Sequence, residues 1–250
     1  MIWAELVQMY DLANLDLKAA IAQGIKGTDM ESIRKDARER LTTALDALSP
    51  ESIRELESIL SIPEKRDEQY QAADIFNQVG HIPQQLFDSI IRAAVYEPNP
   101  SFNRYFIDPC VAQFGNRKVV ISLLEHVKTG TNFEKAGAVN ALYWALPSST
   151  IINGQETEES KRLNKDLGDI SDEMHILLLS EFVHNDDLDV RRSIIPAILG
   201  KDRVYAEDLK QLAERARRIA LAYPATEYIH QRVLVNLGIQ EGLPCKPERG

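Results

Sequence analysis

A short polar turn that leads into an apolar helical segment occurs three times in this chain, and this recurrence limits the folds available to it. The clearest copy spans residues 184–195, where acidic side chains precede Val190 and Arg191 and an apolar run follows. Weaker copies surround Phe102 and Phe133, which are 31 residues apart. Each turn would join two helices into a pair. Neither helix of a pair can bury its apolar stripe alone, so the pairs must stack on one another to form a core.

Apolar residues follow helical spacing over almost the whole chain. After residue 80 this spacing predicts four helix pairs: 84–96 with 101–114, 117–127 with 133–146, 171–182 with 189–199, and 206–222 with 225–237. Pro109 and Pro196 lie inside two of the second helices, where each should kink its helix by removing a backbone hydrogen bond. The middle pair has Ala136-Gly137-Ala138 at the matching place, and such small residues would allow another helix to approach closely.

Helices are also expected in the first 79 residues, over 2–23, from 28 to about 48, over 50–62 and over 67–79. Ser49 should cap the third of these, because serine accepts a backbone hydrogen bond at a helix start and Pro50 fits the first helical position. The best strand candidate, residues 149–154, contains the turn-forming pair Asn153-Gly154 but is too short to change an all-α class. It lies in a polar insertion at about 151–170.

The opening Asp189-Val190-Arg191 resembles the start of the second helix of a HEAT repeat, and degenerate copies extend the resemblance over residues 80–240. It implies an all-α fold of the HEAT-like α-α superhelix type, a solenoid of antiparallel helix pairs. The solenoid would occupy residues 80–250, and residues 1–79 would form an N-terminal helical region of capping or degenerate repeats.

The same resemblance implies structural roles for residues of the third pair. Val190 would be a core residue. Arg191 would bridge adjacent repeats by meeting an aspartate in a neighbouring turn, and Asp187 and Asp189 are the possible counterparts of that aspartate.

The charge of the chain restricts its partners. Thirty-eight acidic and 29 basic residues give a formal net charge of −9, and the pI is about 5.2. Nucleic acids and anionic membranes demand clustered lysine and arginine, so neither is an expected partner. A protein partner is expected instead, and a basic surface on it would suit the charge of this chain.

The two cysteines, Cys110 and Cys245, form no disulfide framework, and this favours a reducing compartment. Cys110 is expected on a buried helix face, where its thiol would be inert. The N-terminal residues have no signal-peptide pattern, and no window approaches 18 uninterrupted apolar residues. A cytoplasmic protein without a membrane span is therefore expected.

No group of residues predicts catalysis, and we expect neither a metal nor a cofactor. His184, Asp186, Asp187 and Asp189 are the best metal candidates, but their spacing matches no EF-hand. A solvated turn between helices, with Asp189 as the N-cap, explains them better. The five histidines form no HExxH pattern, and both a Gly-x-Ser-x-Gly elbow and a phosphate-binding glycine loop are missing.

Two groups of residues are candidates for partner binding. Tyr143 and Trp144 lie in a second helix, and second helices line the concave face of HEAT-type solenoids. Either ring could be an exposed anchor, although one must point inward and core packing explains either. Glu156, Glu158 and Glu159 of the insertion could dock a basic partner or be merely solvated.

The expected function is a non-catalytic protein-binding module that grips a partner along its concave face, as an adaptor, an inhibitor or an immunity-type protein. One alternative is an enzyme with HEAT-like repeats, such as a DNA glycosylase or a lyase that attaches bilin chromophores. Another is a structural subunit of a larger complex. Few basic residues are available on the second helices for DNA phosphates: Arg104, Lys135, Arg191, Arg192 and Arg232. Arg192 is also a candidate for binding a protein partner, besides the two groups named above.

Overall fold

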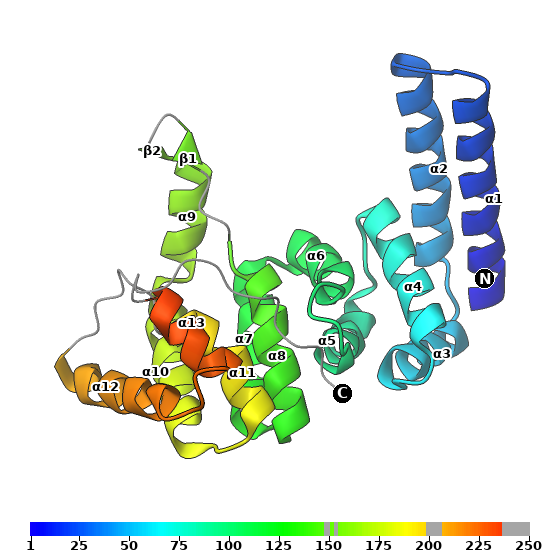
Figure 1. Cartoon of the computed structure of the whole chain (residues 1–250). Helices are drawn as coiled ribbons and strands as arrows, with labels where there is room; N and C mark the ends of the chain where they lie inside the picture. The colour runs from blue at the N-terminus through cyan, green and yellow to red at the C-terminus, as the bar shows by residue number, and fades with distance from the viewer. Residues whose placement is uncertain (148–150, 153–154, 199–206, 237–250) are drawn as a thin grey trace. The chain divides into compact units, whose positions relative to one another are not determined.

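The computed structural model describes residues 1–147, 151–152, 155–198 and 207–236, and its fold is all-α (Figure 1). In chain order its α-helices are α1 (Trp3–Ala22), α2 (Thr28–Asp46), α3 (Pro50–Ser61), α4 (Arg66–Val79), α5 (Phe87–Tyr96), α6 (Asn103–Phe114), α7 (Asn116–Thr129), α8 (Asn132–Ala145), α9 (Glu158–Asp166), α10 (Gly168–His184), α11 (Leu188–Ile198), α12 (Glu207–Leu221) and α13 (Tyr228–Asn236). A short 3-10 helix, η1 (Gln84–Leu86), precedes α5. Within these ranges, no helix combines the length and the apolarity that a bilayer crossing requires.

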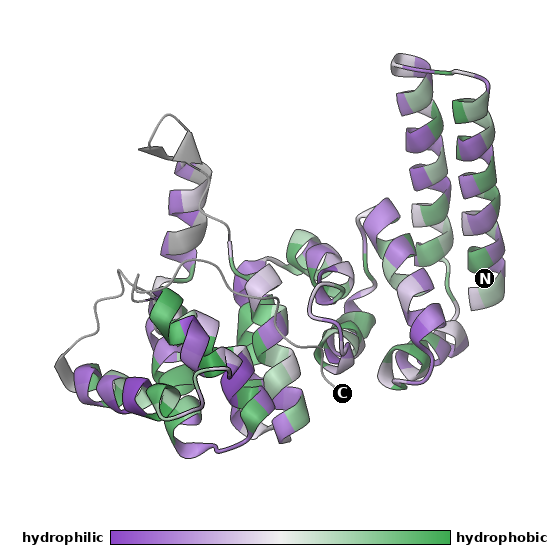
Figure 2. Ribbon diagram, in the orientation of Figure 1, coloured by the Kyte–Doolittle hydropathy of each residue, from purple (hydrophilic) through white to green (hydrophobic). Residues whose placement is uncertain are grey.

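The helices predicted in the N-terminal region and after residue 80 are confirmed, with ends shifted by a few residues, and packing within a pair is shown for the last three of the four predicted pairs. Positions 199, 206 and 237, at predicted helix ends, lie outside the described residues. Figure 2 shows that the helices carry hydrophobic and hydrophilic residues side by side, as helical spacing of apolar residues requires. Pro109 and Pro196 do lie inside helices, in α6 and α11.

The predicted polar insertion contains a short strand pair, where residues 149–154 were the strand candidate, and a helix that was not expected. Strand β1 (Ile151–Ile152) pairs with β2 (Gln155–Glu156) in antiparallel fashion, and α9 follows. This pairing agrees with a hairpin around positions 153–154, which themselves lie outside the described residues, as do 149–150. The high polarity of α9 concealed it, because a helix without a clear apolar stripe gives no periodic signal.

The start of α3 follows the predicted capping arrangement. The Oγ of Ser49 accepts a hydrogen bond from the backbone N–H of Ser52 at 3.2 Å, and Pro50 occupies the first turn. Helix starts leave backbone N–H groups without helical partners, so this contact satisfies one of them.

Replacing Ser49 with alanine should therefore destabilise the N-terminal helices by about 1 kcal/mol. Urea unfolding can be followed by the fluorescence of Trp3 in a Trp144→Phe chain, since Trp3 and Trp144 are the two tryptophans. Ser32→Ala is the matched control, because Ser32 is exposed in the interior of α2. Equal midpoints for the two variants would contradict the capping role.

The chain divides into two compact units. The first comprises Met1–Ala94 and Arg104–Gly115. Within it α1 contacts α2 and α3, and α4 contacts α2 and α3. Buried Gln69 of α4 donates from Nε2 to the carbonyl oxygens of Ile59, Leu60 and Ile62 at 3.0, 3.2 and 2.8 Å. The end of α3, whose last carbonyls have no helical donors, is thereby satisfied from α4.

The second unit comprises Val95–Asn103 and Asn116–Gly250. Its described residues contain three packed helix pairs, α7 with α8, α10 with α11, and α12 with α13. The first helices touch in the order α7, α10, α12, and the second helices touch in the order α8, α11, α13. The pairs therefore stack in two layers, side by side in Figure 1. Val190 is completely buried in this stack, as expected for a core residue.

Gly137 marks a close helix approach inside the second unit. A Cβ atom built on Gly137 would lie 1.9 Å from the carbonyl oxygen of Val95, at the end of α5. No real Cβ tolerates that distance, so only glycine fits the present packing. The expectation that the small residues around Gly137 allow a close helix approach is confirmed.

Candidate partner-binding site

A pocket of about 490 Å³ lies in the second unit where α8, α10, α11 and α13 meet. Apolar side chains dominate its lining, among them Leu142 of α8 and Met174 and Leu178 of α10. Its polar lining residues come from all four helices: Asn140, His175, Ser193, Tyr228 and Arg232. A mostly apolar concavity with a few converging polar groups is the usual form of a ligand site.

Tyr143 and Trp144 are neighbours on α8, and both line this pocket. The Tyr143 side chain is 74% exposed, whereas Trp144 is half-buried. The indole Nε1–H of Trp144 donates to the carbonyl oxygen of Pro100 at 2.8 Å. The two rings meet edge to face with centroids 4.9 Å apart. Trp144 is thus fixed and supports Tyr143, which lowers the entropy cost of ordering Tyr143 on binding.

The connection between α5 and α6 contributes Pro100 and Ser101 to the lining. The buried carboxylate of Glu97 accepts a hydrogen bond from the Asn99 N–H at 2.8 Å. The side-chain oxygen of Asn99 in turn accepts from the Ser101 N–H at 3.0 Å. These local bonds shape the turn and hold the Pro100 carbonyl where Trp144 can reach it.

Arg232 is the only lysine or arginine among the described lining residues, and none of those residues is aspartate or glutamate. It follows Tyr228 by one turn of α13, and both side chains line the pocket. Burial raises the pKa of the Tyr228 phenol, and the positive charge of Arg232 partly opposes that rise. The Nε of Arg232 is buried and has no hydrogen-bond partner in the described part of the chain.

A larger groove of about 690 Å³ runs along α1 and α2 in the first unit. Apolar side chains such as Leu12 and Ile33 line it beside Asp16, Asp36 and Arg40. Its one cation, Arg40, is hydrogen-bonded to Asp36 of the same helix. The guanidinium in the groove is thus engaged within its own helix, and none of the described lining residues is aromatic, so we favour the smaller pocket as the functional site.

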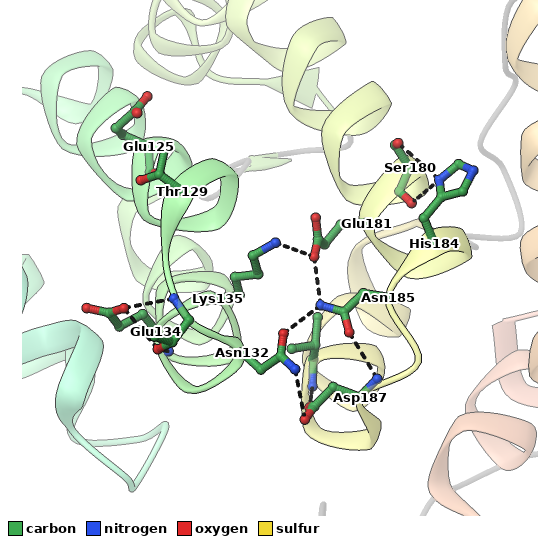
Figure 3. A network of polar contacts seen from close by, with 12 residues as sticks. Glu125, Thr129, Asn132, Glu134, Lys135, Ser180, Glu181, His184, Asn185 and Asp187 are labelled. Carbon is green, nitrogen blue, oxygen red and sulfur yellow. Dashed lines mark hydrogen bonds and ion pairs between the residues drawn. The ribbon is translucent and has the colours of Figure 1, made fainter.

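A polar network joins α8 to the turn between α10 and α11 (Figure 3). Lys135 Nζ lies 2.6 Å from Glu181 Oε1, and the two side chains are 16% and 15% exposed. The Asn185 amide donates to Glu181 and to the Asn132 side-chain oxygen, each at 2.8 Å. The Asn132 amide reaches Asp187 at 3.4 Å. These contacts bind two helix pairs together, and their residues line neither of the two pockets described above, so we assign them to stability.

The acidic turn 184–189 connects two helices, but its cap is Asp187 and not the expected Asp189. Asp187 Oδ1 accepts a hydrogen bond from the Val190 N–H at 2.9 Å, because α11 begins directly after Asp187. His184 Nδ1 lies 2.9 Å from a carbonyl oxygen of its own helix. Where the structure describes the chain, no three histidine, cysteine, aspartate or glutamate side chains are grouped as metal ligands.

Arg191 links its helix pair to the next one, though through different partners from those expected. Its Nε donates to the Phe182 carbonyl at 3.0 Å, and its Nη1 donates to the Tyr223 hydroxyl at 2.9 Å. Tyr223 follows α12, so the inter-pair contact uses a tyrosine where the HEAT resemblance implied Asp187 or Asp189. The Tyr223 phenol can bridge the pairs because it belongs to the next pair. Asp187 and Asp189 cannot, because both lie at the start of α11, in the same pair as Arg191.

The carboxylate contact between pairs is made by the neighbouring residue, Arg192. Its Nε and Nη2 donate to the two oxygens of Glu227 at 2.8 and 3.0 Å, and Asp189 lies 3.5 Å away. The hydrogen bonds from Arg192 lower the pKa of Glu227. The charge of Arg192, a candidate for partner binding, is therefore already neutralised within the unit.

The acidic candidates of the insertion are placed only in part. Glu158 is exposed at the start of α9 and pairs with Lys161 at 2.7 Å. The side chains of Glu156 and Glu159 lie outside the described residues. Cys110 is fully buried in α6, as expected, and Cys245 lies outside the described residues.

Arg232 was expected only among the basic residues of the second helices, and neither Arg232 nor His175 was connected with Trp144. Helix stacking brings them together, since α8, α10 and α13 are distant in sequence. One signal was available, because Tyr228 and Arg232 are four residues apart and must share a helix face.

Comparisons with known proteins add no relative: no protein-family model matches the chain, and neither a curated protein nor a solved structure does.

Proposed function

We propose that the chain is a HEAT-like α-solenoid that binds a segment of a partner protein on the face formed by its second helices, without catalysing a reaction. The stacking of first helices on first helices and of second helices on second helices supports a solenoid. Such stacks present extended surfaces that suit macromolecular partners.

The observation that carries this proposal is the pairing of an exposed aromatic ring with a pocket that crosses three second helices. Tyr143 is 74% exposed at the pocket formed by α8, α11 and α13 with α10. Tyrosine and tryptophan dominate the binding energy of protein interfaces, mostly where they flank a desolvated pocket. An exposed tyrosine held against a fixed tryptophan is therefore suited to a partner contact.

The alternative of a DNA-binding enzyme is disfavoured by the state of the basic residues on the second helices. Arg104, Lys135 and Arg192 are engaged in ion pairs with Asp108, Glu181 and Glu227. Few cations are left for the several phosphate contacts that duplex DNA binding needs.

Tyr143→Ala should strongly reduce partner capture without loss of fold. Truncating a central interface tyrosine typically costs about 2 kcal/mol, or roughly a 30-fold loss of affinity. The test is affinity capture from a nuclease-treated lysate of the source organism with the wild-type chain and the variant, followed by quantitative mass spectrometry. Circular dichroism checks the fold.

Ile121→Ala is the matched control, because Ile121 is a 50% exposed apolar residue on α7, a first helix. The proposal requires a stoichiometric protein that Tyr143→Ala loses and Ile121→Ala retains. Proteins captured equally by all three chains, or recovered only without nuclease, would refute it. Gel filtration of the isolated chain addresses a structural-subunit role, since an obligate subunit would expose large apolar area and self-associate.

A further inference from the structure

The pocket beside Tyr143 has an electrostatic character opposite to that of the chain. The whole chain carries a formal charge of −9. Among the pocket's described lining residues, however, the only permanently charged side chain is the cation Arg232. A positive, acid-free pocket in an acidic protein selects for a negative group at that point and repels a positive one.

No carboxylate among the described lining residues of the pocket neutralises the charge of Arg232. The acidic residue nearest to it in sequence, Glu227 just before α13, is held by Arg192 through bonds of 2.8 and 3.0 Å. The described residues provide Arg232 Nε with no hydrogen-bond partner although it is buried. A ligand carboxylate bound to the terminal nitrogens of Arg232 would neutralise a partly buried charge that no carboxylate among the described lining residues neutralises, although it would not reach the buried Nε.

The surroundings of Arg232 are suited to an apolar group next to the negative one. Leu142, Met174 and Leu178 line the same pocket, and Trp144 stands at its wall. Tyr228 lies one turn before Arg232 and lines the same pocket, and its phenol, neutral at physiological pH, is able to donate a hydrogen bond.

We infer that this pocket recognises a side-chain carboxylate and an adjacent aromatic or large aliphatic side chain in a segment of the partner protein, with Arg232 binding the carboxylate. The inference rests on the proposed protein-binding function and adds the chemistry of the bound segment. A single guanidinium matches one carboxylate, whereas a phosphate would call for several donors. Tyr143 lies largely in solvent beside the pocket, where it can contact residues that flank the anchor, and this favours an internal segment over a chain end.

Selection from a library of random dodecapeptides tests the inference. The peptides are fused through their C-termini to a phage coat protein, so that they present no free carboxyl terminus. The baits are the wild-type chain, Arg232→Gln and Arg218→Gln, the last being an exposed arginine on α12 that does not line the pocket. We expect the wild-type chain and Arg218→Gln to enrich peptides with aspartate or glutamate next to a large apolar residue.

Affinity for one enriched peptide, synthesised with an amidated C-terminus, is then measured by calorimetry. Arg232→Gln should weaken it by about 30-fold or more, since removing one partner of a buried charge pair has effects of that order. Replacing the acidic residue of the peptide with its amide should weaken binding to the wild-type chain similarly. This second measurement decides the matter even if Arg232→Gln does not fold.

Enriched peptides without an acidic residue, or equal affinity for the acid and the amide, would overturn the inference while leaving the protein-binding proposal intact. No enrichment by the wild-type chain would also overturn it. The proposed protein-binding function is tested separately by the capture from lysate. It would be contradicted only if no captured protein depends on Tyr143.

Discussion

Gly137→Ala, which adds a single methyl group, is expected to lower the stability of the second unit. Glycine to alanine inside an exposed helix normally stabilises by about 1 kcal/mol. Here the added methyl group would lie 1.9 Å from the Val95 carbonyl oxygen and 2.9 Å from its carbon. Backbone atoms cannot rotate away as a side chain can, so the helices must separate. Overpacking of this kind costs 1–3 kcal/mol or more, so we expect a net loss of about 2 kcal/mol.

Urea unfolding followed by the fluorescence of Trp144 in a Trp3→Phe chain measures this loss for the second unit. The control is Gly168→Ala in the first turn of α10, where an added Cβ would meet no atom within 4 Å. Gly168→Ala should leave stability unchanged or raise it slightly. If Gly137→Ala proved as stable as Gly168→Ala, the close approach of α8 to the end of α5 would be refuted.

Lys135→Met should destabilise the second unit by about 3 kcal/mol. Lys135 and Glu181 are mostly buried at the contact of α8 with α10, and the methionine would leave the Glu181 carboxylate with only the Asn185 amide. Removing one member of a buried ion pair is costly because the other charge stays desolvated.

The same lysine-to-methionine change at Lys35 provides the comparison, because Lys35 pairs with Glu39 at 3.8 Å with both side chains exposed. Exposed pairs contribute little, so Lys35→Met should change stability by less than about 0.5 kcal/mol. Adding Glu181→Leu to Lys135→Met should recover much of the loss. A double variant no better than Lys135→Met would show that shape, and not charge, governs this contact.

Local rules predicted most helices because local physics determines them. Ser49 and Pro50 mark a helix start by hydrogen bonding and by a fixed φ angle, and both act within a few residues. The Asp187 cap was displaced by two residues from the expected Asp189, since several acidic residues in one turn can each cap and only the backbone path selects one. Helix α9 was missed because it has no apolar period.

The pairing of residues across helices was less predictable. The HEAT resemblance implied that Arg191 meets an aspartate, whereas the structure pairs Arg191 with Tyr223 and gives the carboxylate contact to Arg192. Adjacent arginines on a helix point about 100° apart, so the neighbouring pair decides which one meets the acid. The grouping of Trp144 with Arg232 likewise depends on which helices stack, and that information is distributed over the whole chain.

The segment between α8 and α10 connects two pairs that already touch, since α7 contacts α10 and α8 contacts α11. Its two ends are close in space, because Leu146 and Leu167 line one small pocket. For a loop whose ends are held together by the core, doubling its length adds only about 0.6 kcal/mol of closure entropy. Chain-closure entropy therefore sets little limit on the length of this segment, which already holds the β1–β2 pair and α9. A reporter domain inserted beside these elements would cost the stack little through chain closure.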